Sequence, residues 1–180
     1  MTDPLWVPGR PAKALTLTQP WATLVAIGAK RYETRSWSTA YRGPLAVHAS
    51  REVDRGAALW SDTTVLAELV PAGLLTRPEM PLALEESEVK GRAPAWLARR
   101  FQTGAVVALC ELVECVPTDA LFRVGGALKS LERACGDFSP GRFAWELARV
   151  RALREPVPAR GALGLWDWTP PDDLEERLRV

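Results

Sequence analysis

The chain has 180 residues, the length of one domain, and its 47% hydrophobic and 25% charged residues are typical of globular proteins. It carries 23 lysines and arginines against 22 aspartates and glutamates, which gives a formal net charge of +1 at pH 7. This balance excludes a broadly polybasic protein that binds nucleic acid through its total charge, but it allows a local basic cleft.

Other protein classes are disfavoured by local features. The longest apolar-leaning run, residues 21–29, is shorter than the ~18–20 residues that a membrane span needs, and we expect no secretory signal and no membrane association. Three cysteines without a Cys-x-x-Cys motif indicate a reduced, cytoplasmic protein. His48 is the only histidine, so we expect no histidine-rich metal site and no Ser-His-Asp triad. We also expect no cofactor.

The first elements in chain order are an arm, a strand and a helix. Residues 1–13 contain three prolines and are predicted to form an extended N-terminal arm that Trp6 anchors. Residues 14–18 alternate with the period of a half-buried strand. A helix that begins at Pro20 and stops at Gly28 is expected to bury Trp21, Leu24, Val25 and Ile27.

Two strands and a variable segment come next. Residues 31–37 and 44–49 are strand-like and are separated by a turn. Residues 51–103 are predicted to be a variable insertion of helices and loops. Within it, a helix capped by Ser61 or Asp62 carries apolar residues up to Val70, residues 76–92 form a solvated loop, and Pro94 opens a short helix.

The last third of the chain is predicted to complete a sheet. Residues 104–116 form a strand, Leu128, Leu131 and Cys135 have helical spacing before Gly136, and residues 142–150 and 162–168 are closing strands. Residues 169–180 are expected to form an acidic, exposed tail helix. Short strands with interleaved helices and no internal repeat predict one α+β domain over residues 14–168, built around a small barrel or curled sheet.

Basic residues concentrate in two segments that also carry aromatic side chains. Residues 30–55 hold six basic and three acidic residues, and residues 142–160 hold five and two. Two such segments could line one groove with stacking platforms for single-stranded nucleic acid or nucleotides. The alternative is that these charges are solvated strand edges that protect the sheet from aggregation, and the charge pattern alone favours this alternative.

The densest run of polar and aromatic side chains is residues 28–37, GAKRYETRSW. On a strand, Glu33, Arg35 and Trp37 would share one face. A desolvated Lys30 would have an accessible neutral amine, and Glu33 would accept or relay its proton. The alternative is an ion pair between Lys30 and Glu33 that ties the helix to the strand, and the spacing alone favours this structural pair.

Three ordered blocks of the sequence resemble the ASCH domain family: residues 15–22 (LTLTQPWA), 28–37 and 41–50 (YRGPLAVHAS). The second block contains the family signature Gly-x-Lys-x-x-Glu-x-Arg, and residues 141–147 (GRFAWEL) and 161–166 (GALGLW) are also similar to the family. The resemblance implies a PUA-like β-barrel with helices packed around it. It also implies a cleft beside the barrel that binds RNA or nucleotides.

The resemblance implies an enzymatic alternative as well. Some small bacterial members are amidohydrolases that remove the acetyl group of N(4)-acetylcytidine, and ribonuclease activity is also ascribed to the family. In the amidohydrolases the signature lysine is the nucleophile, with a threonine three residues later and a further glutamate. Lys30 matches the lysine, but Glu33 stands at the threonine position, and Glu146 and Glu111 are alternatives for the further glutamate.

We therefore expect a module that binds RNA, another single-stranded nucleic acid or a modified nucleoside. The alternatives are a metal-independent hydrolase that uses Lys30 and Glu33, and a scaffold that recruits a protein through residues 76–92. Arginines would engage anionic groups, aromatic rings would stack a base, and His48 is expected in the core. The predicted ligand-binding residues are Lys30, Glu33, Arg35, Trp37, Tyr41, Arg42, Arg142 and Trp145.

Overall fold

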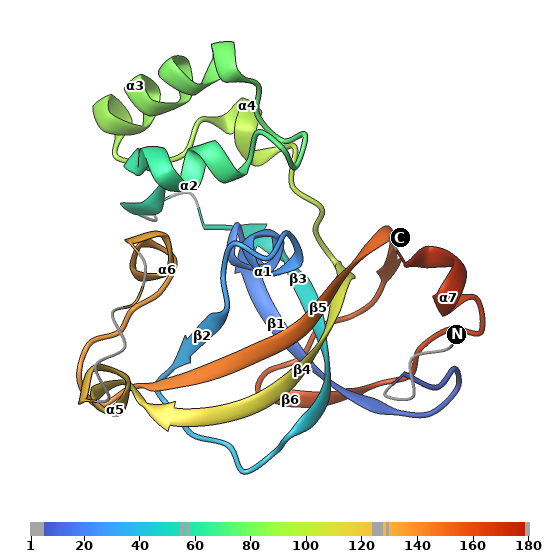
Figure 1. Cartoon of the computed structure of the whole chain (residues 1–180). Coiled ribbons are helices and arrows are strands. Elements are labelled where there is room, and N and C mark those ends of the chain that lie inside the picture. The colour runs from blue at the N-terminus through green and yellow to red at the C-terminus, as the bar shows by residue number, and fades with distance from the viewer. Residues whose placement is uncertain (1–5, 55, 57, 124–127, 129, 179–180) are drawn as a thin grey trace.

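The computed structural model describes residues 6–54, 56, 58–123, 128 and 130–178. The first five residues of the predicted arm, Arg55 of the first basic segment and Arg179 of the predicted tail helix lie outside this part. The fold is α+β, as predicted, with one six-stranded sheet that curls strongly and helices packed around it (Figure 1).

The sheet pairs its strands in the order β2-β5-β4-β3-β1-β6. The pair β1–β3 is parallel and the other pairs are antiparallel. The predicted strands are all present, and β5 extends well beyond its expected end. The strands are β1 (Ala12–Gln19), β2 (Tyr32–Arg35), β3 (Gly43–Val53), β4 (Ala105–Pro117), β5 (Phe143–Pro158) and β6 (Leu165–Trp168).

The described strands do not close the predicted barrel, because the sheet has two edges, β2 and β6. Strand β6 pairs with β1 only over Ala12–Leu15, so β1 continues past the end of its partner. Beyond that point β1 faces β2 without a backbone ladder among the described residues. The Arg35 side chain of β2 links the two strands instead, since its Nη2 donates to the carbonyl oxygen of Thr16 at 3.0 Å.

Both faces of the central strands are buried, which explains their nearly continuous apolar runs. Inside the curl, Leu15, Val47 and Trp145 belong to one buried cluster. On the outer face, Ala46 and Leu109 pack with Trp6, Trp168 and two leucines of the tail, Leu174 and Leu178. The tail helix α7 (Leu174–Arg177) is therefore docked on the sheet, and the prediction that it is exposed is wrong for its leucines.

Helix α1 (Trp21–Ala26) follows Pro20 as expected and packs against the strands inside one mouth of the curled sheet. Its end is marked by Gly28, whose φ of 78° lies in the left-handed region that glycine adopts without strain. The sharp stop directs the following residues, Lys30 and Arg31, away from the helix axis toward β2.

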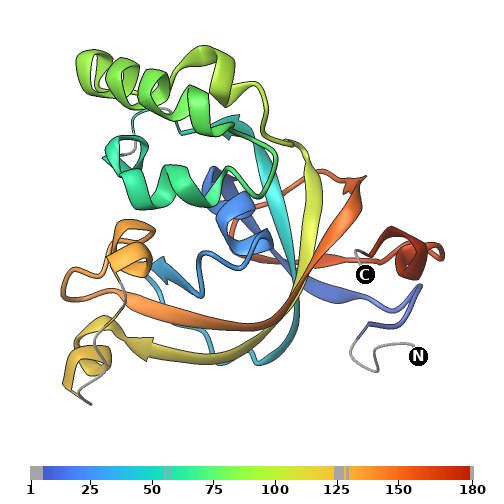
Figure 2. The same cartoon turned by 45° about the horizontal axis from the view of Figure 1, so that its top comes forward.

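A helical layer stands over one end of the sheet (Figure 2). It contains α2 (Thr63–Glu68), α3 (Met80–Lys90), α4 (Ala95–Ala98) and the 3₁₀ turns Ala58–Ser61 and Arg77–Glu79. Asp62 caps α2, since its carboxylate accepts from the backbone N–H groups of Thr64 and Val65.

The predicted loop at residues 76–92 is wrong, because most of this segment forms α3. A capping box between Thr76 and Glu79 starts the helical segment. Helix α3 fully buries only the small side chains of Ala83 and Ser87, while Met80 and Leu84 pack partly buried against the same cluster, so its apolar face is narrow.

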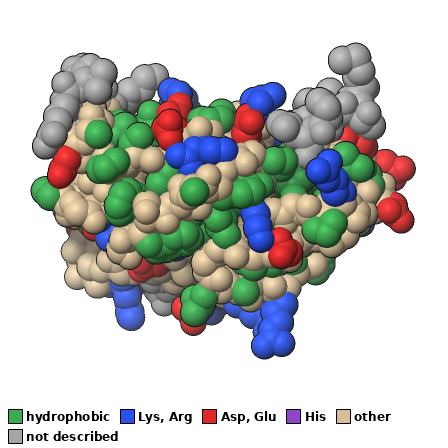
Figure 3. Space-filling view, turned by 90° about the horizontal axis from the view of Figure 1, so that it is seen from below, with side chains coloured by type: hydrophobic (Ala, Val, Ile, Leu, Met, Phe, Trp, Pro, Cys, Tyr) green, Lys and Arg blue, Asp and Glu red, His purple; other side chains and the backbone are tan. Residues whose placement is uncertain are grey.

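Two short helices, α5 (Thr118–Arg123) and α6 (Ser130–Ala134), lie between β4 and β5. Helix α6 confirms the expected helical spacing at Leu131, whereas Leu128 precedes the helix. No helix in the described residues is long and apolar enough to cross a membrane. On the face shown in Figure 3, basic side chains are scattered among acidic and hydrophobic ones, in keeping with the small net charge.

Candidate functional site

A polar pocket occupies the opening between β1 and β2, and we call it the β1–β2 pocket. It has a volume of about 260 Å³. Its walls come from β1, the first turn of α1, β2, the residue that follows β3 and the segment between α6 and β5. The lining residues are Thr16, Leu17, Thr18, Trp21, Glu33, Thr34, Arg35, Asp54, Asp137 and Arg142.

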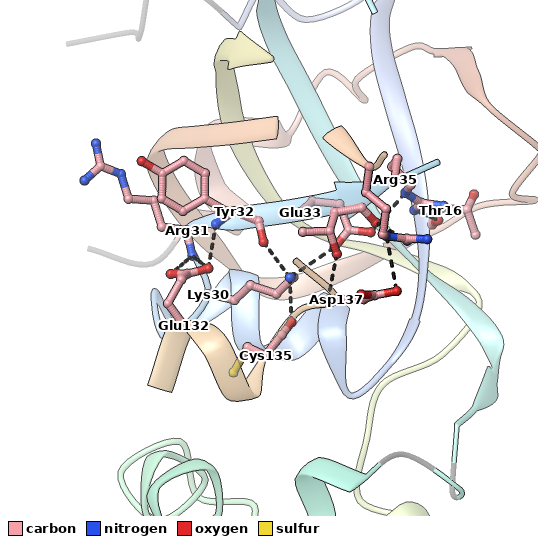
Figure 4. Close-up of polar contacts among 11 residues, drawn as sticks. Thr16, Lys30, Arg31, Tyr32, Glu33, Arg35, Glu132, Cys135 and Asp137 are labelled. Carbon is pink, nitrogen blue, oxygen red and sulfur yellow. Dashed lines mark hydrogen bonds and ion pairs between the residues drawn. The ribbon is translucent and has the colours of Figure 1, made fainter. Parts of the chain in front are cut away.

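Lys30 lies immediately beneath this pocket, and its side chain has no exposed surface. Its Nζ donates to the carbonyl oxygens of Tyr32 at 2.5 Å and Cys135 at 2.6 Å, and it lies 3.4 Å from Oε2 of Glu33 (Figure 4). An ammonium group has three N–H donors, and here three acceptors surround it. The site therefore satisfies Lys30 as a buried cation.

The contacts of Lys30 depend on α6, which covers it from more than a hundred residues further along the chain. The Glu132 carboxylate accepts from the backbone N–H groups of Arg31 and Tyr32, so α6 is bonded to the start of β2. The segment after α6 approaches closely at Gly136, where a Cβ would lie 2.8 Å from the Phe138 ring and 3.4 Å from Lys30 Nζ.

Glu33 is 7% exposed and is held between two cations. Its Oε2 faces Lys30, and its Oε1 lies 3.0 Å from Nε of Arg35. The contact with Arg35 is a charge contact without an aligned hydrogen bond, because Arg35 Nε has no hydrogen-bond partner. The carboxylate is thus fixed in the wall of the pocket and keeps lone pairs for a further donor.

Arg142 lines the pocket together with Asp137 and Thr34. Its Nε lies 3.3 Å from Oδ2 of Asp137, and its Nη2 donates to the Thr34 carbonyl at 3.3 Å. The Asp137 backbone N–H donates to Thr34 Oγ1. Hydrogen bonds from Ser139, followed by the charge of Arg142, lower the pKa of Asp137, so its carboxylate is ionised at neutral pH.

The aromatic side chain in the pocket is Trp21, which is half-buried and which the sequence placed in the core. The expected stacking residue Trp37 instead packs edge-to-face on Trp145, with ring centroids 4.6 Å apart. Trp145 is fully buried and donates from Nε1 to the Trp37 carbonyl. Its predicted role in ligand binding is therefore corrected to one in the core.

Tyr41 and Arg42 lie outside the β1–β2 pocket. The Tyr41 hydroxyl donates to the Pro44 carbonyl at 2.5 Å, and Arg42 pairs with Glu114 at 2.5 Å. Both line a separate pocket of about 380 Å³ beside Trp6. The structure thus brings four of the predicted site residues together and separates the other four. The residues at or beneath the β1–β2 pocket are Lys30, Glu33, Arg35 and Arg142.

The two glutamates considered for a catalytic role beside Lys30 are engaged elsewhere. Glu146 pairs with Arg31, and Glu111 pairs with Arg149. The site residues that sequence reasoning missed belong to segments joined only by the fold: Thr16, Thr18, Trp21, Asp54, Glu132 and Asp137. Within the described residues, no group of three or more His, Cys, Asp or Glu side chains is placed to hold a metal ion.

Comparison with known protein families identifies a family model that matches most of the chain. The model of the ASCH domain matches residues 15–157, a range that includes β2, most of β1 and β5, and the residues that line the β1–β2 pocket. No curated protein matches the chain.

Proposed function

Because this chain belongs to the ASCH domain family, we propose that its β1–β2 pocket binds RNA or a nucleotide-like ligand by enclosing one nucleobase. The observation that carries this proposal is the buried carboxylate of Glu33. Lys30 and Arg35 hold it in the wall of a pocket that also offers an aromatic ring and two guanidinium groups.

The chemistry of these groups complements the edge of a base. A carboxylate accepts hydrogen bonds from ring N–H and exocyclic amino groups, as glutamate does with the N4 amino group of cytosine. Arg35 and Arg142 carry Nη groups that donate to ring nitrogens and carbonyl oxygens. Trp21 supplies a π-face for stacking, which tolerates every base. A base with donors beside acceptors, such as cytosine, fits this arrangement.

The size of the pocket favours one unpaired base. Its volume of about 260 Å³ is smaller than the ~300–1,000 Å³ of sites for drug-sized ligands. Proteins that read RNA sequence take up single-stranded bases that are splayed from the stack. A modified nucleoside or a single-stranded RNA is therefore a better ligand than a duplex.

The geometry of Lys30 favours binding over the amidohydrolase alternative. A nucleophilic lysine needs a neutral amine that reaches the substrate. Here the Nζ faces three acceptors and the side chain has no exposed surface. Lys30 is better placed to position Glu33 than to attack a carbonyl carbon.

We also propose that the curled sheet is this chain's form of the PUA-like barrel, with the β1–β2 pocket at the seam where the strands separate. The proposed location is the cytoplasm. It is supported by the three free thiols of Cys110, Cys115 and Cys135, of which Cys110 and Cys135 are buried.

Titration of cytidine, N(4)-acetylcytidine and a short single-stranded RNA, followed by nuclear magnetic resonance and calorimetry, tests the proposal. We expect binding that Arg142→Gln weakens and that Arg99→Gln, on the distant helical layer, leaves unchanged. The same samples are assayed for release of cytidine from N(4)-acetylcytidine. Turnover that disappears in a folded Lys30→Arg variant would replace the binding proposal with the amidohydrolase, and absence of any binding would overturn the proposal.

A further inference from the structure

A second, larger pocket adjoins the β1–β2 pocket and shares Thr16 with it; we call it the Arg160 pocket. Its volume is about 560 Å³, and it lies where the second halves of β1 and β3 meet the loop between β5 and β6. Thr16 faces both pockets, because its carbonyl oxygen accepts from Arg35 and its hydroxyl accepts from Trp166 Nε1. The lining residues are Thr16, His48, Ser50, Arg51, Gly104, Ala159, Arg160, Gly161, Ala162 and Leu163.

The two pockets differ in charge. The β1–β2 pocket is lined by two arginines and by three carboxylates, those of Glu33, Asp54 and Asp137, of which Glu33 and Asp137 pair with the arginines. The described residues that line the Arg160 pocket include Arg51 and Arg160 but no aspartate or glutamate. Within the described part of the chain, neither of these guanidinium groups forms an ion pair, and both side chains are exposed. Two unpaired arginines in one acid-free pocket are suited to an anionic group.

The loop that carries Arg160 is fixed against buried side chains. The buried His48 ring contacts the Ala159 carbonyl through Nε2 at 3.0 Å. Burial lowers the pKa of His48, so the ring is neutral at pH 7 and Nε2 acts as the donor. At Gly161 a Cβ would lie 2.5 Å from the His48 ring and 2.7 Å from Thr16 Oγ1, so only glycine allows this approach. The position of the Arg160 backbone is thus set before a ligand arrives.

We propose that the Arg160 pocket binds the phosphate group of the nucleotide whose base occupies the β1–β2 pocket. The inference rests on the proposed function and adds to it the orientation of the ligand, which would extend past Thr16 from the β1–β2 pocket into the Arg160 pocket. In this orientation the base contacts the Glu33 carboxylate and two arginines that are already paired with carboxylates. The phosphate contacts Arg51 and Arg160, in a pocket whose described lining contains no aspartate or glutamate. Leu163, which is 98% exposed, extends the pocket with an apolar surface for the ribose or a neighbouring base.

The test compares cytidine, cytidine 5′-monophosphate and ribose 5-phosphate as ligands. The proteins are the wild type, an Arg51→Ala/Arg160→Ala double variant, and an Arg92→Ala/Arg99→Ala control in the helical layer. We expect the monophosphate to bind the wild type about tenfold or more tightly than cytidine, because charge-assisted hydrogen bonds to phosphate add that much affinity. The double variant should lose this advantage and keep its affinity for cytidine, and the control should keep both.

Two further readouts distinguish the sources of phosphate and the two proposals. With a short single-stranded RNA, the negative slope of log affinity against log salt should become shallower by about 0.7 in the double variant, the value for the loss of one phosphate contact. Ribose 5-phosphate alone should shift the amide resonances of Gly161 and Ala162 in the wild type but not in the double variant.

The outcomes separate cleanly. If cytidine binds and its phosphate gives no arginine-dependent advantage, the phosphate site is wrong and the base site stands. If ribose 5-phosphate shifts the loop resonances while no nucleoside binds, the Arg160 pocket is a phosphate site and the proposed function is wrong. If neither ligand perturbs the protein, both proposals are overturned.

Discussion

Lys30 Nζ lies 3.4 Å from Glu33 Oε2, and the two side chains are almost completely shielded from solvent. The pair joins Lys30, two residues after Gly28 ends α1, to the second residue of β2, so it ties the helix to the strand, as the spacing favoured. The same contact fixes the Glu33 carboxylate in the β1–β2 pocket. This ion pair therefore links α1 to β2 and also fixes a residue of the candidate site.

Replacement of Lys30 by methionine should strongly destabilise the fold. The apolar chain fills the space, but Glu33 and the carbonyls of Tyr32 and Cys135 lose their buried donor. Removal of one partner of a buried ion pair costs about 3–5 kcal/mol of unfolding free energy. Urea unfolding measures this loss.

Two companion variants make the Lys30 prediction specific. Lys90→Met breaks an exposed pair with Glu86 and should change the free energy by less than about 1 kcal/mol. Lys30→Met combined with Glu33→Gln should cost less than the sum of the single changes, since the uncompensated carboxylate is gone. A loss of under 1 kcal/mol for Lys30→Met alone would contradict the account.

Trp21 is predicted to be the stacking residue. Trp21→Leu keeps an apolar side chain against the core but removes the aromatic face, so affinity for cytidine 5′-monophosphate should fall by the ~1–3 kcal/mol of base stacking. Trp37→Leu is the matched control, because Trp37 packs on Trp145 away from the pocket and should affect stability rather than affinity. If calorimetric titration shows that Trp37→Leu weakens binding and Trp21→Leu does not, the base binds elsewhere.

His48 should titrate below its ordinary pKa of 6.5, since burial disfavours the imidazolium. The unfolded chain then binds a proton at a higher pH than the folded one. The free energy of unfolding is therefore highest above pH 6.5 and falls as pH drops from there toward the folded pKa.

The lone histidine makes the His48 prediction directly measurable. Its Hε1 resonance reports the folded pKa, and urea unfolding at pH 7.5 and pH 5.5 reports the change in stability. His48→Gln, whose amide can also donate to Ala159, should remove most of the pH dependence. A folded pKa at or above 6.5 would show that the ring is not shielded as described.

Gly161→Ala should destabilise the protein by about 1–3 kcal/mol, the usual cost of forcing extra atoms into a packed site. Its Cβ would overlap the buried His48 ring and the Thr16 hydroxyl. Gly56→Ala is the control, since its Cβ meets only an Asp54 oxygen at 3.7 Å. Equal melting temperatures for the two variants would mean that the loop at Gly161 is free to move.

Much of the fold follows from local patterns in the sequence. The strand at Ala12–Gln19, the helix after Pro20 and the stop at Gly28 depend on alternation, proline and glycine within a few residues. Helix α3 was missed because the prolines and glutamates of this segment indicated a solvated loop, although Met80, Ala83 and Leu84 have helical spacing and pack on the helical layer. Closure of the sheet could not be predicted, since it depends on how far β6 and β2 extend along their neighbours.

The candidate site was predictable only where it is local. Lys30, Glu33 and Arg35 lie within six residues, and their shared position was expected. The strand β2 ends at Arg35, so strand alternation does not place Trp37 on the same face, and its half-buried ring packs against the core instead. Glu132, Cys135 and Asp137 reach the site from a segment a hundred residues away, and nothing in their spacing links them to Lys30.

The most direct test of the account is the affinity of Glu33→Gln for cytidine 5′-monophosphate. Glutamine has the same size but lacks the charge and one acceptor oxygen, so a folded variant should bind about tenfold or more weakly. Glu114→Gln, which removes an exposed partner of Arg42, serves as the control and should bind like the wild type. Wild-type affinity in a folded Glu33→Gln protein would contradict the claim that this carboxylate receives the base.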